Sequence, residues 1–202
     1  RWDLFRDTSV GRYLWGHEWR FIQVALASVI VPGMVLDLGC GSGRLTVPLS
    51  QRGFDTIGLE PDPVALRSFR RACESVPLVR ASGIELPFAG ETFRAITALQ
   101  VIDYLPLRRF LHECHRVLAD GGLLIFDALN RTSYKGVLKR ATSRTLDLPS
   151  GNVSMREVVN ALEQAGFQIH TVQGYNWLPF SRHSNSPLVP AAATLETFLR
   201  LN

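Results

Sequence analysis

The stretch of sequence that decides the fold reads Val35-Leu36-Asp37-Leu38-Gly39-Cys40-Gly41-Ser42-Gly43. An apolar run followed by three spaced glycines predicts a short buried strand that leads into a helix through a tight turn. Glycines lack side chains, so the backbone of this turn can approach a ligand closely, and the helix amides that follow point toward it. Because ligands of open parallel sheets bind beyond the carboxyl ends of the strands, we expect a ligand at this turn.

The same alternation of strands and helices extends along the rest of the chain. Strands are predicted at 34–38, 56–60, 78–80, 93–99, 123–128 and 168–174, and helices at 18–30, 45–52, 62–75, 106–118, 154–166 and 194–201. Strands separated by helices of this length predict right-handed crossovers. We therefore expect an α/β fold with a doubly wound, mostly parallel sheet and helices on both faces. Residues 140–153 have little periodicity and are expected to form a loop.

Composition and charge narrow the class of protein. The 202 residues are 46% hydrophobic and 20% charged, which fits one globular domain. No apolar run reaches the ~20 residues of a membrane span, and the charged first residues do not resemble a signal peptide. The three cysteines are odd in number and widely spaced, which favours a reducing, cytoplasmic location. The net charge of +4 falls largely on helices as arginine, so it is weak evidence for nucleic acid.

Two carboxylates accompany the glycine turn. Asp37 lies among the last residues of the strand, where a purely structural strand would carry another apolar residue. Glu60 ends the second strand, where a carboxylate can accept hydrogen bonds from both hydroxyls of a ribose. Together they indicate a nucleoside ligand.

The residue after the turn helps to distinguish between two nucleoside cofactors. The dinucleotide fingerprint requires a small residue where this chain has Arg44, and a pyrophosphate gains little from the neighbouring Asp37. A cationic sulfonium ligand with an amino-acid end tolerates that acid well. The pattern favours S-adenosylmethionine over NAD, and an NAD(P)-dependent oxidoreductase is kept as an alternative.

Residues 35–43 with Glu60 resemble the cofactor signature of class I S-adenosylmethionine-dependent methyltransferases. The resemblance continues in order through 86–96, 100–105 and 113–124, and so covers about residues 33–130. A co-linear set of this kind is more specific than any single motif. It implies a Rossmann-like fold, an enzyme that transfers a methyl group, S-adenosylmethionine as cofactor and S-adenosylhomocysteine as product.

Carried over by position, the resemblance assigns residues to the methionine half of the cofactor. The glycine turn would line its methionine end through Asp37, Gly39, Cys40 and Gly41. The backbone of Gln100, just after the strand at 93–99, would lie near the sulfonium.

The resemblance also assigns residues to the nucleoside half. Glu60 would hold the ribose hydroxyls, Pro61 would pack on the adenine, and Ser82 and Gly83 would lie at its edge. Many relatives carry Asp where this chain has Ser82. A neutral hydroxyl is a weaker hydrogen-bond partner for the adenine amino group than a carboxylate.

The resemblance further predicts how one domain spanning 1–202 is organised. An N-terminal helical lid segment would occupy 1–31, the cofactor-binding core 33–130, and the substrate side with the last helix, strand and helical tail 131–202. The family ends with an antiparallel seventh strand, and no strand-like run follows residue 174. We therefore expect that strand to be missing from this chain.

Candidates for binding the acceptor are fewer and less specific. They are Tyr13, Tyr104, Asn130 and Tyr134. Aromatic residues near the N-terminus also pack on sheets, and polar loop residues also form turns. No catalytic group can be assigned, and an oxygen acceptor would require a base, for which the candidates are Asp103, Tyr104, His17 and His183.

Other ligands and functions are disfavoured. His112, Cys114 and His115 do not share one helix face, so no metal site is predicted. Residues 100–103 lack the Asp/Asn-Pro-Pro-aromatic motif of DNA amino-methyltransferases. We expect a small-molecule acceptor, with its identity, the methylated atom and the oligomeric state open. A non-catalytic binding protein with the same fold is a second alternative.

Overall fold

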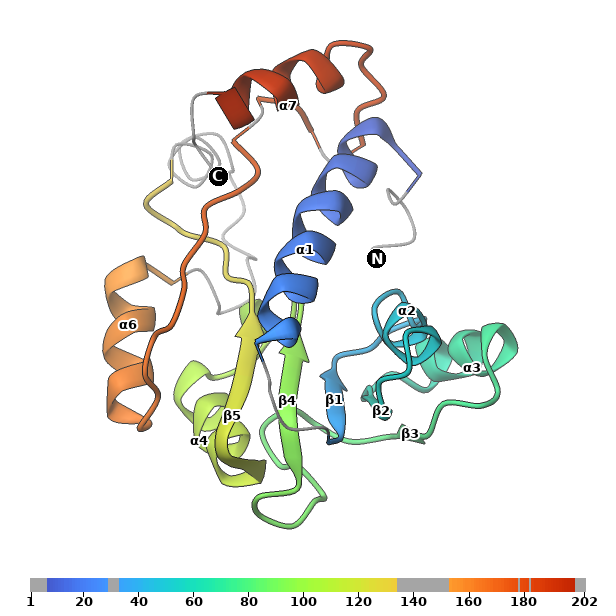
Figure 1. The fold of residues 1–202 in the computed structure, drawn as a ribbon, viewed down its shortest axis with the longest axis vertical. Helices are drawn as coiled ribbons and strands as arrows, with labels where there is room; N and C mark the ends of the chain where they lie inside the picture. Colours follow the sequence, from blue (N-terminus) through green and yellow to red (C-terminus); the bar gives the residue numbers. More distant parts are fainter. Residues whose placement is uncertain (1–6, 29–32, 134–152, 178, 182, 199–202) are drawn as a thin grey trace. The chain divides into compact units, whose positions relative to one another are not determined.

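The computed structural model describes residues 7–28, 33–133, 153–177, 179–181 and 183–198 (Figure 1). The chain forms two compact units by contact between its segments. The larger comprises Val29–Ile169, and the smaller joins Arg1–Ser28 to His170–Asn202. The prediction of a single domain with three sections stays a prediction.

The larger unit contains a five-stranded parallel sheet in the order β3-β2-β1-β4-β5. The strands are β1 (Val35–Leu38), β2 (Thr56–Leu59), β3 (Leu78–Val79), β4 (Phe93–Ala98) and β5 (Leu118–Phe126). This confirms the predicted doubly wound α/β fold. Because the strand order reverses between β1 and β4, that pair forms the topological switch point of the sheet.

Helices cover both faces of this sheet (Figure 1). They are α2 (Thr46–Gln51), α3 (Pro63–Ala72), α4 (Leu107–Val117) and α6 (Met155–Gln164), and a 3-10 turn, η2, spans Ile102–Tyr104. Leu36 and Leu38 pack with Phe110 of α4, whereas Asp37 contacts Thr46 of α2. Successive side chains of a strand point to opposite faces, so α4 and α2 lie on opposite sides of the sheet.

The smaller unit pairs α1 (Ser9–Ala27) with α7 (Val189–Phe198). Val10, Leu14 and Val189 form its apolar centre. No helix in the described part of the chain is long and apolar enough to cross a lipid bilayer.

One predicted strand is wrong. Residues 168–174 have no strand pairing in the structure. Ile169 is 42% exposed and Val172 is 59% exposed, so this segment has no buried apolar face that would favour joining a sheet.

Several predicted boundaries also differ. The first helix begins at Ser9 rather than residue 18, with Thr8 as its N-cap, and β5 begins at Leu118 rather than Leu123. Gly121 and Gly122 lie within β5, where its register with β4 shifts. The last helix begins at Val189 rather than residue 194. The predicted loop at 140–153 lies outside the described residues, except for Val153.

Candidate functional site

The predicted glycine turn lies at the switch point, directly after β1. Gly39, Gly41 and Gly43 all have positive φ values, of 75°, 55° and 94°. A Cβ on Gly43 would lie 3.0 Å from the Phe69 ring, so close packing against Phe69 explains why this position is a glycine. A Cβ on Gly41 would meet nothing within 4 Å. The turn is therefore open at Gly41, where a ligand could approach the backbone.

Gly39 brings the turns after β1 and β4 together. A Cβ on Gly39 would lie 2.3 Å from Cγ2 of Val101, which is closer than two non-bonded carbon atoms can approach. The backbone N–H of Gly39 donates to the carbonyl of Leu59 over 2.7 Å, which ties the turn to the end of β2. The glycine turn is thus held from both neighbouring strands.

Glu60 lies against the glycine turn. Its carboxylate accepts hydrogen bonds from the backbone N–H of Gly41 over 3.1 Å and of Asp62 over 3.0 Å. A carboxylate offers about four lone-pair positions, so Glu60 retains capacity for further donors. The carboxylate predicted for the ribose is therefore fixed beside the open position of the turn.

Asp37 is a buried carboxyl group beneath the turn, with its residue only 3% exposed. Thr46 Oγ1 donates to Oδ2 over 2.6 Å, and Thr97 Oγ1 donates to Oδ1 over 2.9 Å. Burial raises the pKa of Asp37 above its usual value, and the two threonine hydrogen bonds and the charge of Arg44 offset only part of this rise. Neither Thr46 nor Thr97 was predicted from the sequence, although parallel pairing places Thr97 directly opposite Asp37.

The predicted adenine edge is a surface loop over the end of β1. Ser82 and Pro61 are exposed, whereas Gly83 is buried. A Cβ on Gly83 would lie 2.8 Å from Leu38 and from Leu105, so this glycine permits the loop to pack on the strand end. The arrangement leaves the Ser82 and Pro61 surfaces free to receive a planar ring.

An ion pair on α4 anchors the continuation of this loop. Glu113 accepts from the backbone N–H of Leu86 over 2.8 Å, and Arg116 donates to the carbonyls of Leu86 and Phe88 over 2.9 and 2.8 Å. Arg116 also donates to both carboxylate oxygens of Glu113. The hydrogen bonds from Arg116 lower the pKa of Glu113 to about 2. This helix was predicted at 106–118, but its role in holding the loop was not predictable from the sequence.

Gln100 lies at the carboxyl end of β4 with φ of 58°. Its backbone N–H donates to Oδ1 of Asp127, which follows β5. Asp127 was not predicted from the sequence, although it is an acid directly after a strand, as Glu60 is. Residues from the ends of β1, β2, β4 and β5 therefore meet around the switch point.

The Cys40 side chain faces away from the open side of the turn. The residue is 5% exposed and packs with Phe69 and Val76. Burial raises its pKa, and the nearby charges of Asp37 and Glu60 raise it further. Its thiol is therefore a neutral packing group, and a cofactor contact would use only its backbone.

The acceptor candidates are divided between the two units. Tyr104 is 54% exposed in η2. Asn130 accepts hydrogen bonds from the backbone N–H and the hydroxyl of Thr132, which makes it a turn former. Tyr13 belongs to the smaller unit, where its hydroxyl donates to Glu196. Tyr134 lies outside the described residues.

The candidate bases are also distributed over both units. Asp103 and Tyr104 lie in η2, whereas His17 and His183 belong to the smaller unit. Burial lowers the pKa of His17, and the charge of Glu196 opposes this effect. Within the described residues, no group of three or more His, Cys, Asp or Glu side chains could hold a metal ion.

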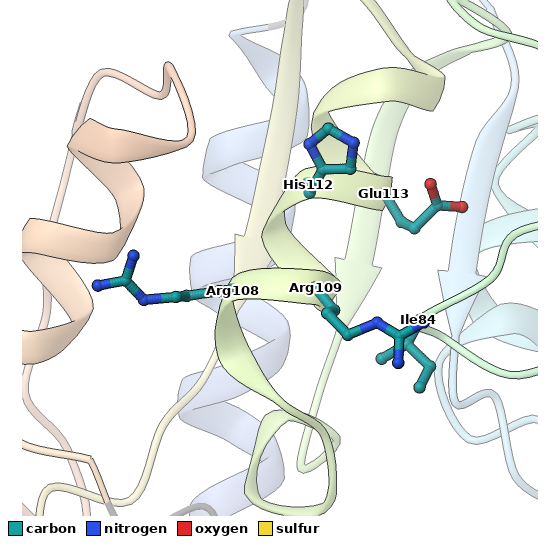
Figure 2. Close-up of a pocket in the computed structure, with 5 residues that line it drawn as sticks. All are labelled: Ile84, Arg108, Arg109, His112 and Glu113. Atoms are coloured by element: carbon teal, nitrogen blue, oxygen red, sulfur yellow. The ribbon is translucent and has the colours of Figure 1, made fainter.

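A surface hollow lies elsewhere on α4 and is lined by Ile84, Arg108, Arg109, His112 and Glu113 (Figure 2). Figure 2 shows Arg108 and Arg109 pointing in different directions. The Glu113 carboxylate accepts a hydrogen bond from Arg116. The lining groups do not converge, so we assign no ligand to this hollow.

Comparison with known proteins agrees with this geometry. Residues 36–126, from β1 through β5, match the profile of the methyltransferase domain family. Residues 36–126 therefore form a domain of the methyltransferase family. The chain is 30% identical over 171 residues to the human mitochondrial ubiquinone biosynthesis O-methyltransferase, an alignment that covers 73% of the chain and 44% of the relative. It is 29% identical to the ubiquinone biosynthesis O-methyltransferase of Azorhizobium caulinodans, covering 86% and 71% respectively.

Solved structures show the same fold. A Thermotoga maritima S-adenosylmethionine-dependent methyltransferase, described as a possible histamine N-methyltransferase, superposes with a TM-score of 0.60 at 23% identity. The superposition covers 84% of this chain and 82% of that protein. The chain spans less than half the length of its human relative.

Proposed function

We propose that this methyltransferase transfers a methyl group from S-adenosylmethionine to a small-molecule acceptor. The observation that carries the proposal is the Glu60 carboxylate, fixed by the Gly41 amide beside an open glycine turn at the switch point. A carboxylate in this place suits a pair of ribose hydroxyls. The family to which the chain belongs supports the same cofactor.

The other residues fit the remaining parts of the cofactor. Pro61 after β2 and Ser82 after β3 offer exposed surfaces for the adenine, and Gly83 lets the Ser82 loop lie close to β1. The Gln100 backbone would lie at the sulfonium end. Asp37 is too buried to provide a broad contact, so it would support the glycine turn from beneath, through its hydrogen bond from Thr46 at the start of α2.

The chemistry requires positioning more than proton transfer. S-adenosylmethionine supplies an activated methyl group: the acceptor atom forms a bond to the methyl carbon as the carbon–sulfur bond breaks, and S-adenosylhomocysteine leaves. Holding the two reactants in line is worth up to ~7–11 kcal/mol. An acceptor hydroxyl would pass its proton to a base or to water.

The relatives favour an oxygen acceptor on a small molecule. Both are named as ubiquinone biosynthesis O-methyltransferases. We therefore propose O-methylation of a hydroxylated small molecule, with no role for nucleic acid.

Cys40, Cys73 and Cys114 are all free thiols, which supports the proposal that the protein works in a reducing compartment such as the cytoplasm. The oxidoreductase alternative has no support from the family.

Calorimetric titration with S-adenosylmethionine, S-adenosylhomocysteine and NAD tests the proposal. We expect micromolar binding of the two sulfur ligands and none of NAD. Glu60→Ala should abolish this binding, because it removes the acceptor of the ribose hydroxyls. Glu74→Ala, which removes an exposed acid elsewhere, is the matched control and should bind as the unchanged protein does. Failure of the unchanged protein to bind either sulfur ligand would refute the proposal.

Turnover is a separate question from binding. Incubation with S-adenosylmethionine and a panel of hydroxylated small molecules should yield S-adenosylhomocysteine and a methylated product. Intact cofactor binding without transfer to any acceptor would instead favour the non-catalytic binding protein.

A further inference from the structure

The carboxyl ends of β4 and β5 are joined by an unusual hydrogen bond. Parallel pairing sets Ala98 beside Phe126, so the residues that follow the two strands are neighbours. There the backbone N–H of Gln100 donates to Oδ1 of Asp127. The side chain of one strand end thus holds the backbone of the other.

The backbone conformation of Gln100 explains why such a hydrogen bond matters. Its φ of 58° lies in the left-handed region, which is unfavourable for a residue that carries a Cβ. Glycine would adopt this conformation at no steric cost, yet the chain has glutamine here. A hydrogen bond to a carboxylate is stronger than one to a neutral acceptor, so Asp127 can offset the unfavourable conformation.

The next residue links this conformation to the glycine turn. Val101 packs so closely on Gly39 that a Cβ added to Gly39 would lie 2.3 Å from Cγ2 of Val101. A change in the Gln100 backbone would therefore move Val101 relative to the turn. Since the two turns flank the switch point, their separation sets the width of the candidate cofactor site.

We propose that Asp127 is a positioning residue for the cofactor site, an inference that rests on the proposed function. Its carboxylate holds Gln100 in the left-handed conformation, and this keeps Val101 against Gly39. Asp127 thus acts on the cofactor through Gln100 and Val101 rather than by touching it.

A double-mutant cycle on Asp127 and Gln100 tests the proposal through S-adenosylhomocysteine affinity. Asp127→Ala should weaken binding about tenfold or more, because the Gln100 amide loses its acceptor. Asp127→Asn should weaken it less than about threefold, because the amide oxygen still accepts. In the Gln100→Gly background, Asp127→Ala should also cost less than about threefold, because glycine adopts the conformation unaided.

Glu163→Ala is the matched control, since it removes an exposed acid from α6. A merely structural role for Asp127 would lower the unfolding temperature but give the same loss of affinity in both backgrounds. That additive result, or full affinity in Asp127→Ala, would overturn the inference while leaving the proposed function intact. Absence of binding by the unchanged protein would instead overturn the proposed function, and the inference with it.

The hydrogen bond itself has a readout that needs no ligand. The Gln100 amide proton should resonate downfield in the NMR spectrum of the unchanged protein and shift upfield in Asp127→Ala. The upfield shift should be smaller in Asp127→Asn, because the amide oxygen still accepts the hydrogen bond. An unchanged resonance in Asp127→Ala would also overturn the inference.

Discussion

At the scale of single residues, the candidate site depends on a carboxyl group that the fold buries. Asp37 lies between α2 and β4, and the hydroxyls of Thr46 and Thr97 donate to its two oxygens. A polar group is costly to bury unless it is hydrogen-bonded. The two elements that flank Asp37 each supply one of these donors.

Replacing Thr97 by Val should reveal this dependence. Valine keeps the shape but removes the donor to Oδ1, so we expect a loss of about 1–3 kcal/mol in the free energy of unfolding at pH 7. Urea denaturation measures it, with the exposed Thr171→Val as control, expected within ~0.5 kcal/mol of the unchanged protein. A Thr97→Val protein as stable as that control would contradict the account.

Glu113 gives a prediction that depends on pH. The Arg116 hydrogen bonds lower its pKa from 4.5 to about 2 in the folded state. Because the folded pKa lies below the unfolded one, the ionised side chain stabilises the protein above pH 4.5, and this stabilisation is lost as the pH falls through about 2. The stability difference between the unchanged protein and Glu113→Gln should therefore shrink from pH 5 toward pH 2 in urea titrations. A difference that does not vary with pH would count against the ion pair.

These residues show what local sequence reveals and what it does not. The glycine turn and Glu60 were predictable because each lies directly beside the strand that positions it. Thr97 lies far along the chain from Asp37, and only the register of β1 with β4 brings them together. Asp127 could have been found by the reasoning that found Glu60, since both are acids that follow a strand.

At the scale of elements, the largest difference from expectation has a physical cause. The apolar positions of α1 repeat as Val10, Leu14, Ile22 and Leu26, with Glu18 in the middle of the stripe. A buried acid interrupts the periodicity, so the sequence suggested a later start. Glu18 is accommodated because Tyr175, 157 residues away, donates to it over 3.2 Å. No local pattern contains that partner.

The packing of α4 on the sheet should dominate the stability of the larger unit. Phe110 is fully buried and contacts Phe126 edge to face, with ring centroids 6.2 Å apart. Phe110→Ala should lower the free energy of unfolding by about 3–5 kcal/mol, because it removes a large buried ring and leaves a cavity. Arg109→Ala on the exposed side of the same helix should change it by less than ~0.5 kcal/mol. If Phe110→Ala and Arg109→Ala lowered the free energy of unfolding equally in urea denaturation, α4 would not pack on the sheet through Phe110.

At the scale of the whole molecule, the two ends of the chain make one unit. Tyr13 in α1 donates to Glu196 in α7, and Tyr175 donates to Glu18. Both acids are buried, with 2% and 5% exposure. Neither terminal segment supplies both partners of these hydrogen bonds, so the segments should lose their order together.

Hydrogen exchange can test that coupling. Glu196→Ala removes the acceptor of the Tyr13 hydroxyl, so the amides of both α1 and α7 should exchange faster. The amides of β1 and β4 should keep their protection, because they belong to the larger unit. Faster exchange confined to α7 would show that the two ends are not one cooperative unit.

We propose that the switch point between β1 and β4 is the S-adenosylmethionine site, and a crystal structure with S-adenosylhomocysteine would test this. We expect the ribose hydroxyls within hydrogen-bond distance of the Glu60 carboxylate, the adenine against Pro61 and Ser82, and the homocysteine end over Gly39 and Gly41. A ligand bound elsewhere, with Glu60 still held only by the Gly41 and Asp62 amides, would contradict it.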